Sequence, residues 1–288
     1  MTEIRENAEQ FVLNVACPNR PGIVHALTSV LIAHECDIAQ HQQFDDHVHD
    51  MLFTRTAFGL ATADADVLRT EIGVVADRFG MTWQLHDARR PVRALVMVSK
   101  FGHCLNDLLY RWTAGSLDAD IVQVVSNHED LRPMAERAGV PFTYVPVTKG
   151  SKPEAEERLK QIVIENDVDL VVLARYMQVL SDDLCTWMGG RAINIHHSFL
   201  PSFKGARPYH QAYLRGVKQI GATAHYVTPD LDEGPIIEQD VTRVDHSLSP
   251  DDLVATGRDV ESLVLARAVQ WHAQHRVLQY GSRTVVFK

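Results

Sequence analysis

The spacing of apolar and polar residues divides the chain into two parts, and each part predicts its own architecture. Up to residue 87, apolar runs typical of strands are separated by apolar residues at helical spacing. Strands are expected at residues 11–16, 38–44, 51–58 and 81–85, with one helix beginning at Gly22 and another over 67–79. This β-α-β-β-α-β order is typical of a ferredoxin-like sheet with two helices on one face.

From Arg93 onward, short apolar runs of the kind buried on both faces alternate with helical segments. This pattern predicts a doubly wound, mostly parallel sheet, so we expect an α/β protein. Strands are expected at 93–99, 121–126, 142–146, 170–174, 192–196 and 236–244, with a last edge strand at 285–287 and helices at 103–113, 131–138, 154–166 and 250–274. The polar segment around Pro91 marks a boundary, which gives a domain 1–87, a linker 88–92 and a domain 93–288.

The composition narrows the class of protein. The 288 residues are 45% hydrophobic and 23% charged, enough for a sizeable core, and the formal net charge of −9 opposes a nucleic-acid-binding surface. The four cysteines form no Cys-x-x-Cys motif, and the first ten residues are polar and acidic, unlike a secretory signal. The apolar run at 170–174 is far too short to span a membrane. We therefore expect a cytoplasmic protein with no membrane and no nucleic-acid partner.

The candidate chemistry lies between residues 192 and 235. Asn194 and His196 are two positions apart at the end of a predicted strand, so their side chains point the same way, where the sites of such sheets lie. An amide and an imidazole directed at one point suit a developing oxyanion. Asp232, beside Gly234 in a later loop, could reach back to fix the tautomer of the imidazole and favour its charged form. Taken singly, each residue has an ordinary structural explanation, and only the combination favours chemistry.

The two parts of this segment together resemble a known family. Asn-x-His-x-Ser-x-Leu-Pro at 194–201, followed by Leu-Asp-x-Gly-Pro at 231–235, is similar to the motif of the folate-dependent formyltransferase/hydrolase family. In that family an Asn, a His and an Asp act on the formyl group of 10-formyltetrahydrofolate. The resemblance implies these catalytic roles for Asn194, His196 and Asp232. It implies further substrate contacts at His197, Ser198 and Gly234, and a slot for the pterin ring lined by Met177, Val179 and Leu180.

One loop departs from the pattern of the family's glycinamide ribonucleotide formyltransferases. Those proteins hold the acceptor phosphate in a glycine-rich loop after the first strand of this domain, whereas residues 98–108 here keep only Gly102, beside Phe101 and His103. A bulky loop brings fewer backbone amides close to a phosphate, although Lys100 still offers charge. His197 is a second departure, since that family usually has Pro there.

These departures predict that water is the acceptor of the formyl group. The resemblance then implies hydrolysis of 10-formyltetrahydrofolate to formate and tetrahydrofolate, which balances one-carbon folate pools and supplies formate for purine synthesis. We expect no metal and no cofactor apart from the folate substrate. The alternatives are a phosphoribosylglycinamide formyltransferase and a catalytically silent amino-acid sensor that only binds folate. A methionyl-tRNA formyltransferase fits poorly, because the chain is acidic and has no room for a further nucleic-acid domain.

The first strand–helix turn carries a second resemblance. Asn19, Arg20, Pro21 and Gly22, within the predicted β-α-β-β-α-β segment, resemble the ligand-holding turn of ACT domains, which bind amino acids. Free amide groups at a helix N-terminus suit a carboxylate. The resemblance suggests glycine or methionine as an effector, or a domain kept only for dimerisation, in a homo-oligomer of two or four chains. His47 and His49, in an acidic segment, are explained by a polar hairpin without a metal.

Overall fold

The computed structural model describes residues 11–60, 65–148, 150–200 and 208–288. The chain divides into two compact units. The first contains the described residues up to Arg90, together with 274–278 and 285–288, and the second contains 91–273 and 279–284. The C-terminal segments that belong to the first unit were not part of the predicted domain division.

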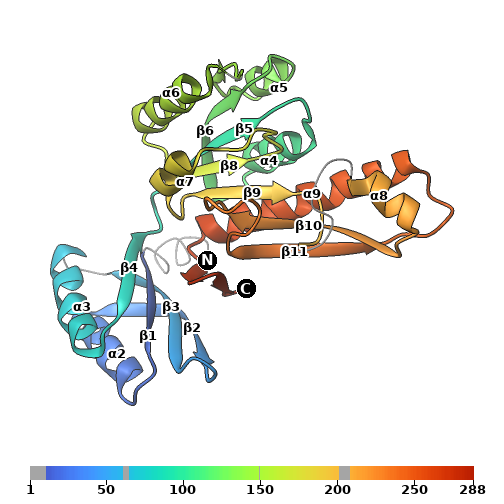
Figure 1. Ribbon diagram of the computed structural model, residues 1–288. Helices are drawn as coiled ribbons and strands as arrows, with labels where there is room; N and C mark the ends of the chain where they lie inside the picture. The colour runs from blue at the N-terminus through green and yellow to red at the C-terminus, as the bar shows by residue number, and fades with distance from the viewer. Residues whose placement is uncertain (1–10, 61–64, 149, 201–207) are drawn as a thin grey trace. The chain divides into compact units, whose positions relative to one another are not determined.

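The first unit has the predicted element order. It comprises β1 (Phe11–Pro18), α2 (Ile23–Ala33), β2 (Cys36–Asp46), β3 (Met51–Leu60), α3 (Ala65–Phe79) and β4 (Thr82–Asp87). The strands form an antiparallel sheet in the order β2-β3-β1-β4 (Figure 1). Leu27 and Leu31 of α2 and Leu68 and Ile72 of α3 recur at helical spacing and are buried in one core with the sheet.

The opposite face of this sheet is also buried, although it carries polar side chains. Asn14 donates to the carbonyl of His275 at 3.0 Å, and Arg55 donates to the carbonyl of Gln274 at 3.1 Å. The rings of His86 and His275 stack 3.8 Å apart. The returning C-terminal segment therefore covers polar positions that would otherwise face solvent, and hydrogen bonds offset their burial.

The second unit is built on a seven-stranded mixed sheet (Figure 1). Its strands are β5 (Val92–Val98), β6 (Ala119–Ser126), β7 (Phe142–Tyr144), β8 (Leu170–Leu173), β9 (Ala192–His196), β10 (Gln219–Tyr226) and β11 (Ile236–Arg243). They lie in the order β11-β10-β9-β8-β5-β6-β7. The pairs from β9 to β7 are parallel, and β10 and β11 pair antiparallel. This is the predicted mostly parallel sheet.

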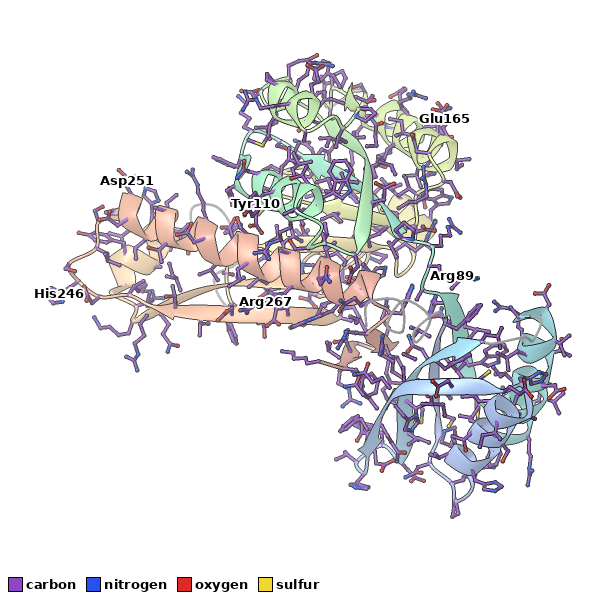
Figure 2. All side chains as sticks on the ribbon, turned by 180° about the vertical axis from the view of Figure 1, so that it is seen from behind. Arg89, Tyr110, Glu165, His246, Asp251 and Arg267 are labelled. Carbon is purple, nitrogen blue, oxygen red and sulfur yellow. The ribbon has the colours of Figure 1, made fainter. Side chains whose placement is uncertain are left out.

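Six helices are described in this unit. They are α4 (His103–Thr113), α5 (Arg132–Arg137), α6 (Lys152–Glu165), α7 (Asp182–Met188), α8 (Pro208–Arg215) and α9 (Pro250–Ala273). Apolar residues of α6 and α7 share a core with Leu95 and Met97 of β5. The long α9 packs along β9, β10 and β11 and contacts α4. Arg267 of α9, labelled in Figure 2, reaches Asp240 of β11 at 3.0 Å.

Several elements of the structure differ from the sequence expectation. Residues 285–287 do not extend the main sheet. Instead, β13 (Arg283–Val286) pairs with β12 (Val277–Tyr280) in a separate two-stranded sheet, because the chain turns back at Gly281, which has a φ of 58°. The elements α7, α8, β10 and β12 were not among those expected. No helix among the described residues has both the length and the apolar character needed to cross a bilayer.

Candidate active site

Two neighbouring strands place three polar side chains at one edge of the larger sheet. Asn194 and His196 belong to β9, and the antiparallel register sets His225 of β10 opposite Asn194. Paired residues in a sheet project to the same face. The amide Nδ2 of Asn194 lies 3.2 Å from Nε2 of His225, and Nδ1 of His225 donates to the Tyr226 carbonyl at 2.8 Å. The second hydrogen of the Asn194 amide is therefore available to another acceptor.

The loop after β10 brings the carboxylate of Asp232 to this edge. Asp232 has a φ of 59°, in the left-handed region that few side chains adopt. Gly234 is buried directly against the Tyr226 carbonyl, where no side chain fits. The Tyr226 amide donates to the Pro235 carbonyl at 2.9 Å and closes the loop. The backbone thus fixes where Asp232 points.

Asp232 contacts both imidazoles. Its Oδ2 lies 3.2 Å from Nδ1 of His196, and its Oδ1 lies 3.7 Å from Nε2 of His225. Burial raises the pKa of Asp232, but hydrogen bonds and charge from His196 and His225 outweigh it and hold the pKa well below the ordinary value. An ionised Asp232 makes Nδ1 of His196 the donor, so the tautomer of His196 is set.

The remaining nitrogen of His196 is free for chemistry. Its side chain is 6% exposed, and its Nε2 is buried without a hydrogen-bond partner among the described residues. A buried polar atom left unpaired is unfavourable unless a ligand or water completes it. In its charged form, His196 would present an N–H from Nε2 to an oxygen in the adjoining cleft.

A cleft of about 260 Å³ adjoins these groups. Asn194, His196, His197, His225 and Asp232 line it, and the segment 175–180 forms much of the rest. Met177 and Val179 are 51% and 59% exposed there, and Leu180 is half-buried. The geometry brings the predicted catalytic residues and the predicted pterin slot together around one space.

The segment 175–180 is fixed to the sheet by a buried hydroxyl that the sequence analysis did not single out. Ser99, at the end of β5, accepts from the Met177 amide at 2.9 Å and donates to Asn127 at 2.7 Å. Only 3% of Ser99 is exposed. This hydroxyl therefore holds the wall of the cleft, and the neighbouring Lys100 is exposed.

Two of the predicted substrate contacts lie behind the cleft and do not line it. Ser198 is 5% exposed, and its carbonyl accepts from the Thr223 hydroxyl at 2.9 Å. Gly234 is buried against Tyr226. Their positions indicate that they support the loops on which the lining residues stand.

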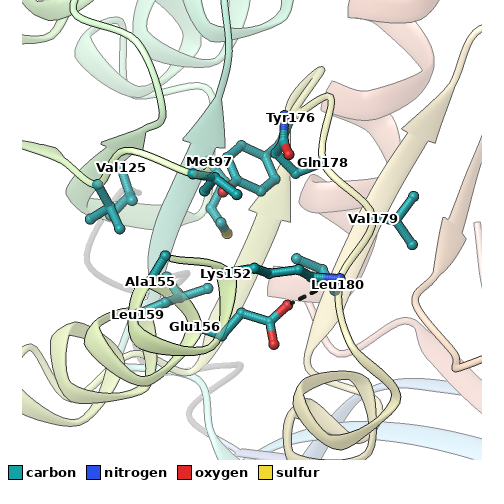
Figure 3. A pocket seen from close by; sticks show the side chains of 12 residues that line it. Met97, Val125, Lys152, Ala155, Glu156, Leu159, Tyr176, Gln178, Val179 and Leu180 are labelled. Atoms are coloured by element: carbon teal, nitrogen blue, oxygen red, sulfur yellow. Dashed lines mark ion pairs between the residues drawn. The ribbon is translucent and has the colours of Figure 1, made fainter. Parts of the chain in front are cut away.

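A second, much smaller cavity is also lined by residues of the segment 176–180 (Figure 3). Its volume is about 10 Å³, and Lys152 and Glu156 pair across 3.8 Å at its edge. Glu156 also accepts from the amide and the hydroxyl of Ser181. The space admits little more than one water, so we assign it no ligand.

In the first unit, the predicted effector residues form the turn between β1 and α2. Gly22 caps α2 with a φ of 92°, and its carbonyl accepts from Ala26. Arg20, Pro21 and Gly22 are exposed, while the backbone N–H of Asn19 donates to the Asp50 carbonyl at 2.9 Å. The turn thus presents the first amides of a helix beside an exposed arginine, which suits a carboxylate.

Two groups of residues were weighed as metal ligands. In the hairpin, Asp46 accepts from the amides of Val48 and His49 and pairs with the His49 ring at 2.9 Å, as a polar turn does without a metal. Elsewhere, ligand atoms of His103, Cys104 and Glu261 lie within 4.8 Å of one another. An arginine pairs with the same Glu261 carboxylate, and that positive charge opposes a bound cation.

His225 is, like Ser99, a residue of the site that sequence reasoning missed. It sat in an apolar stretch and carried no motif of its own. The signal that could have identified His225 is strand pairing, because an antiparallel strand that follows β9 places one of its residues opposite Asn194. The register that selects His225 is not readable from spacing alone, because it also depends on the connection between the two strands and on which face of the sheet is buried.

Comparisons with known proteins show what the chain is similar to. Residues 92–269 match a family model described as formyl transferase. A formyltetrahydrofolate deformylase of Corynebacterium sp. (strain P-1) is 51% identical over 281 residues, which are 97% of this chain and 98% of the relative. The crystal structure of formyltetrahydrofolate deformylase from Burkholderia mallei is 50% identical with a TM-score of 0.93, over 97% of this chain and 100% of that one. That of glycinamide ribonucleotide transformylase 1 from Symbiobacterium toebii is 30% identical with a TM-score of 0.64, over 69% and 95%.

Proposed function

The chain belongs to the formyltetrahydrofolate deformylases within the formyl transferase family, and we propose that it hydrolyses 10-formyltetrahydrofolate to formate and tetrahydrofolate in the cleft beside β9. The reaction balances one-carbon folate pools and yields formate for purine synthesis. The single observation that carries the site assignment is convergence. Asp232 is distant in sequence from Asn194 and His196, yet all three line one cleft, where an imidazole nitrogen has no hydrogen-bond partner among the described residues.

The proposed reaction begins with the formyl carbonyl facing Asn194 and His196. A water held by Asp232 attacks the formyl carbon. The free hydrogen of the Asn194 amide and the Nε2–H of charged His196 stabilise the oxyanion that forms. Asp232 supports the charge on His196 and takes up the proton of the water, directly or through a second water.

Collapse of the tetrahedral intermediate completes the hydrolysis. The bond between the formyl carbon and folate N10 breaks, and N10 receives a proton as tetrahydrofolate leaves. The proton given up by the water is thereby returned, and the enzyme regains its starting state. His225 orients the Asn194 amide by accepting a hydrogen bond from it at Nε2, so it supports the oxyanion donor.

The pterin ring is proposed to lie against the segment 176–180. Strand-end backbone groups can pair with its edge, while Met177, Val179 and Leu180 cover its faces. Ser99 holds this segment through the Met177 amide, which gives the slot a fixed wall. No step is assigned to a metal or cofactor, because the formyl amide is already activated and Asn194, His196 and Asp232 supply the charge. The check is dialysis against a chelator, after which full activity is expected.

The test is product analysis with 10-formyltetrahydrofolate and no other acceptor. Stoichiometric formate and tetrahydrofolate are expected. Turnover that requires glycinamide ribonucleotide would favour the transformylase alternative, which rests on lower identity over the second unit alone. Folate binding with no formate would favour a silent sensor and refute the hydrolase.

The first unit is proposed to be an ACT-like regulatory domain. Its β-α-β-β-α-β order, antiparallel sheet and exposed Arg20–Gly22 turn support this proposal. Glycine or methionine is the proposed effector, in a dimer or tetramer. Calorimetric titration of the full chain with each amino acid, alongside turnover and light scattering, tests it. Arg20→Ala should abolish any response, and a response that survives this change would place the effector elsewhere.

A further inference from the structure

A buried carboxylate on α9 organises a polar cluster next to the catalytic histidine. Glu261 is 1% exposed, and its Oε1 accepts from the Tyr209 hydroxyl at 2.6 Å. Its Oε2 lies 2.8 Å from Nε2 of His103 and 3.3 Å from Nε of Arg175. Gly257, one turn earlier on α9, leaves room for the Tyr209 ring. Four elements far apart in sequence thus converge on one ionised side chain, which none of the proposed catalytic steps uses.

Arg175 connects this cluster to the residue after the catalytic histidine. It follows β8 with a φ of 66°, a backbone conformation that is unfavourable for a long side chain. Its Nη1 lies 2.6 Å from Nδ1 of His197. A guanidinium has no lone pair and only donates. Nδ1 of His197 must therefore accept, which leaves the ring neutral with its proton on Nε2.

His197 in turn stacks on the catalytic ring. The centroids of His196 and His197 are 4.7 Å apart, and the planes differ by 19°. Two stacked imidazoles repel if both are charged, so only one can readily hold a proton. Whichever group fixes the protonation of His197 therefore also decides which ring of the pair carries the charge.

The surroundings of His197 all bear on its protonation. The titratable or charged groups that face it from neighbouring elements are Arg175 after β8, His196 on β9, Tyr209 on α8, Glu261 on α9 and Asp232 after β10. Burial, then Arg175 and His196, lower the pKa of His197 to about 4, against the opposing charges of Glu261 and Asp232. At neutral pH the ring is uncharged.

We propose that Arg175, anchored by Glu261, is a positioning residue that keeps His197 neutral, so that His196 alone carries the proton used at the formyl oxygen. This inference rests on the proposed function of His196. The proposal gives a physical role to Glu261 and to His197, a position at which the glycinamide ribonucleotide formyltransferases usually have proline. A cluster that merely joined α9 to the sheet would have no need of a guanidinium directed at an imidazole.

The experiment compares Arg175→Met, Arg175→Lys and the matched control Arg158→Met. The control removes an exposed arginine of α6 whose partners within the described part of the chain, Gln161 and Glu165, lie on the same helix. Activity is followed from pH 5 to pH 9, and the histidine rings are followed by ¹⁵N NMR. In Arg175→Met, His197 should titrate closer to the ordinary value of about 6.5. If it reaches that value, about nine-tenths of His197 is charged at pH 5.5, and turnover there falls roughly tenfold relative to pH 8.

Arg175→Lys keeps a charged donor and should restore most of the activity at pH 5.5, whereas Arg158→Met should match the wild type throughout. A uniform loss of activity in Arg175→Met, with a lower melting temperature and an unshifted acid limb, would show a structural role and overturn the inference. If Arg175→Met does not fold, the ¹⁵N NMR spectrum of the wild-type histidine rings tests the proposal. His197 must be neutral and protonated on Nε2 at pH 6, and a charged ring refutes the proposal. Absence of formate from the wild type would instead refute the proposed function and leave the ring assignments intact.

Discussion

Replacing Gly234 with alanine should separate Asp232 from the imidazoles that it contacts, although Gly234 does not line the cleft. Gly234 lies two residues after Asp232 in the loop that returns from β10. A Cβ added here falls far inside contact distance of the Tyr226 carbonyl oxygen, 2.9 Å from the carbonyl carbon and 3.3 Å from Nδ1 of His225. These are backbone atoms and a ring held in place by the sheet, so the loop itself must move.

The size of the effect follows from these distances. Relief of the overlap requires a displacement of about 1 Å or more, since carbon atoms pack at roughly 3.5 Å. The hydrogen bond from His196 to Asp232 is 3.2 Å long and does not survive such a shift. A misplacement of about 1 Å at a reacting group lowers turnover roughly a hundredfold. Overpacking of this kind also lowers the free energy of unfolding by about 1–3 kcal/mol.

The assay is formate release from 10-formyltetrahydrofolate under saturating substrate, with urea unfolding measured in parallel. Gly150→Ala is the matched control, because Gly150 has open space at its Cβ and no positive φ. It should leave both kcat and stability close to the wild type. Gly234→Ala with kcat within threefold of the wild type would show that the position of Asp232 does not depend on this contact, and the site geometry argued above would then be wrong.

Three further predictions test the site and the fold. Asn194→Ala should lower kcat about a hundred- to a thousandfold with little change in KM, because one oxyanion donor is lost; near-normal turnover contradicts that role. His225→Ala should lower kcat about ten- to a hundredfold by releasing the Asn194 amide, with unfolding measured to exclude a general loss of structure. Burial lowers the pKa of both His86 and His197 to about 4, so the unfolded chain binds more protons between pH 6.5 and 4. The free energy of unfolding should therefore fall across this interval, by at most about 3 kcal/mol per histidine, and a flat urea-denaturation profile from pH 7 to pH 5 would contradict it.

The spacing of apolar residues in the sequence predicted most of the fold, because the larger sheet is buried on both faces. β5, β8 and β9 are near-continuous apolar runs, and α4 begins and ends where its apolar spacing does. The pattern was weak where tertiary contacts decide the structure. Four elements were not expected, namely α7, α8, β10 and β12. Of these, α8, packed against α9 through Tyr209 and Ala212, and the short β12 have no apolar stripe of their own.

The candidate site was predictable only in part, for a similar reason. Asn194 and His196 share a strand, so their common direction follows from a period of two. His225 and Ser99 act through strand register and through a hydrogen bond to the segment 175–180, and neither leaves a spacing that a single sequence reveals. Arg175 and Glu261 are still harder to identify, because 86 residues separate two groups that meet at 3.3 Å.

The residues of this site are held in position in two different ways, some by the paired strands of the sheet and one by a loop. Asn194, His196 and His225 stand on two paired strands, where hydrogen bonds fix the backbone on both sides. Asp232 stands on a loop in a left-handed conformation, yet it must meet two of these rings at once. Strand residues tolerate changes nearby because the sheet redistributes strain, whereas a loop residue keeps its place only through the few contacts that pin it. The close approach of Gly234 to Tyr226 is such a contact, so the catalytic carboxylate depends most on a residue that has no side chain to offer.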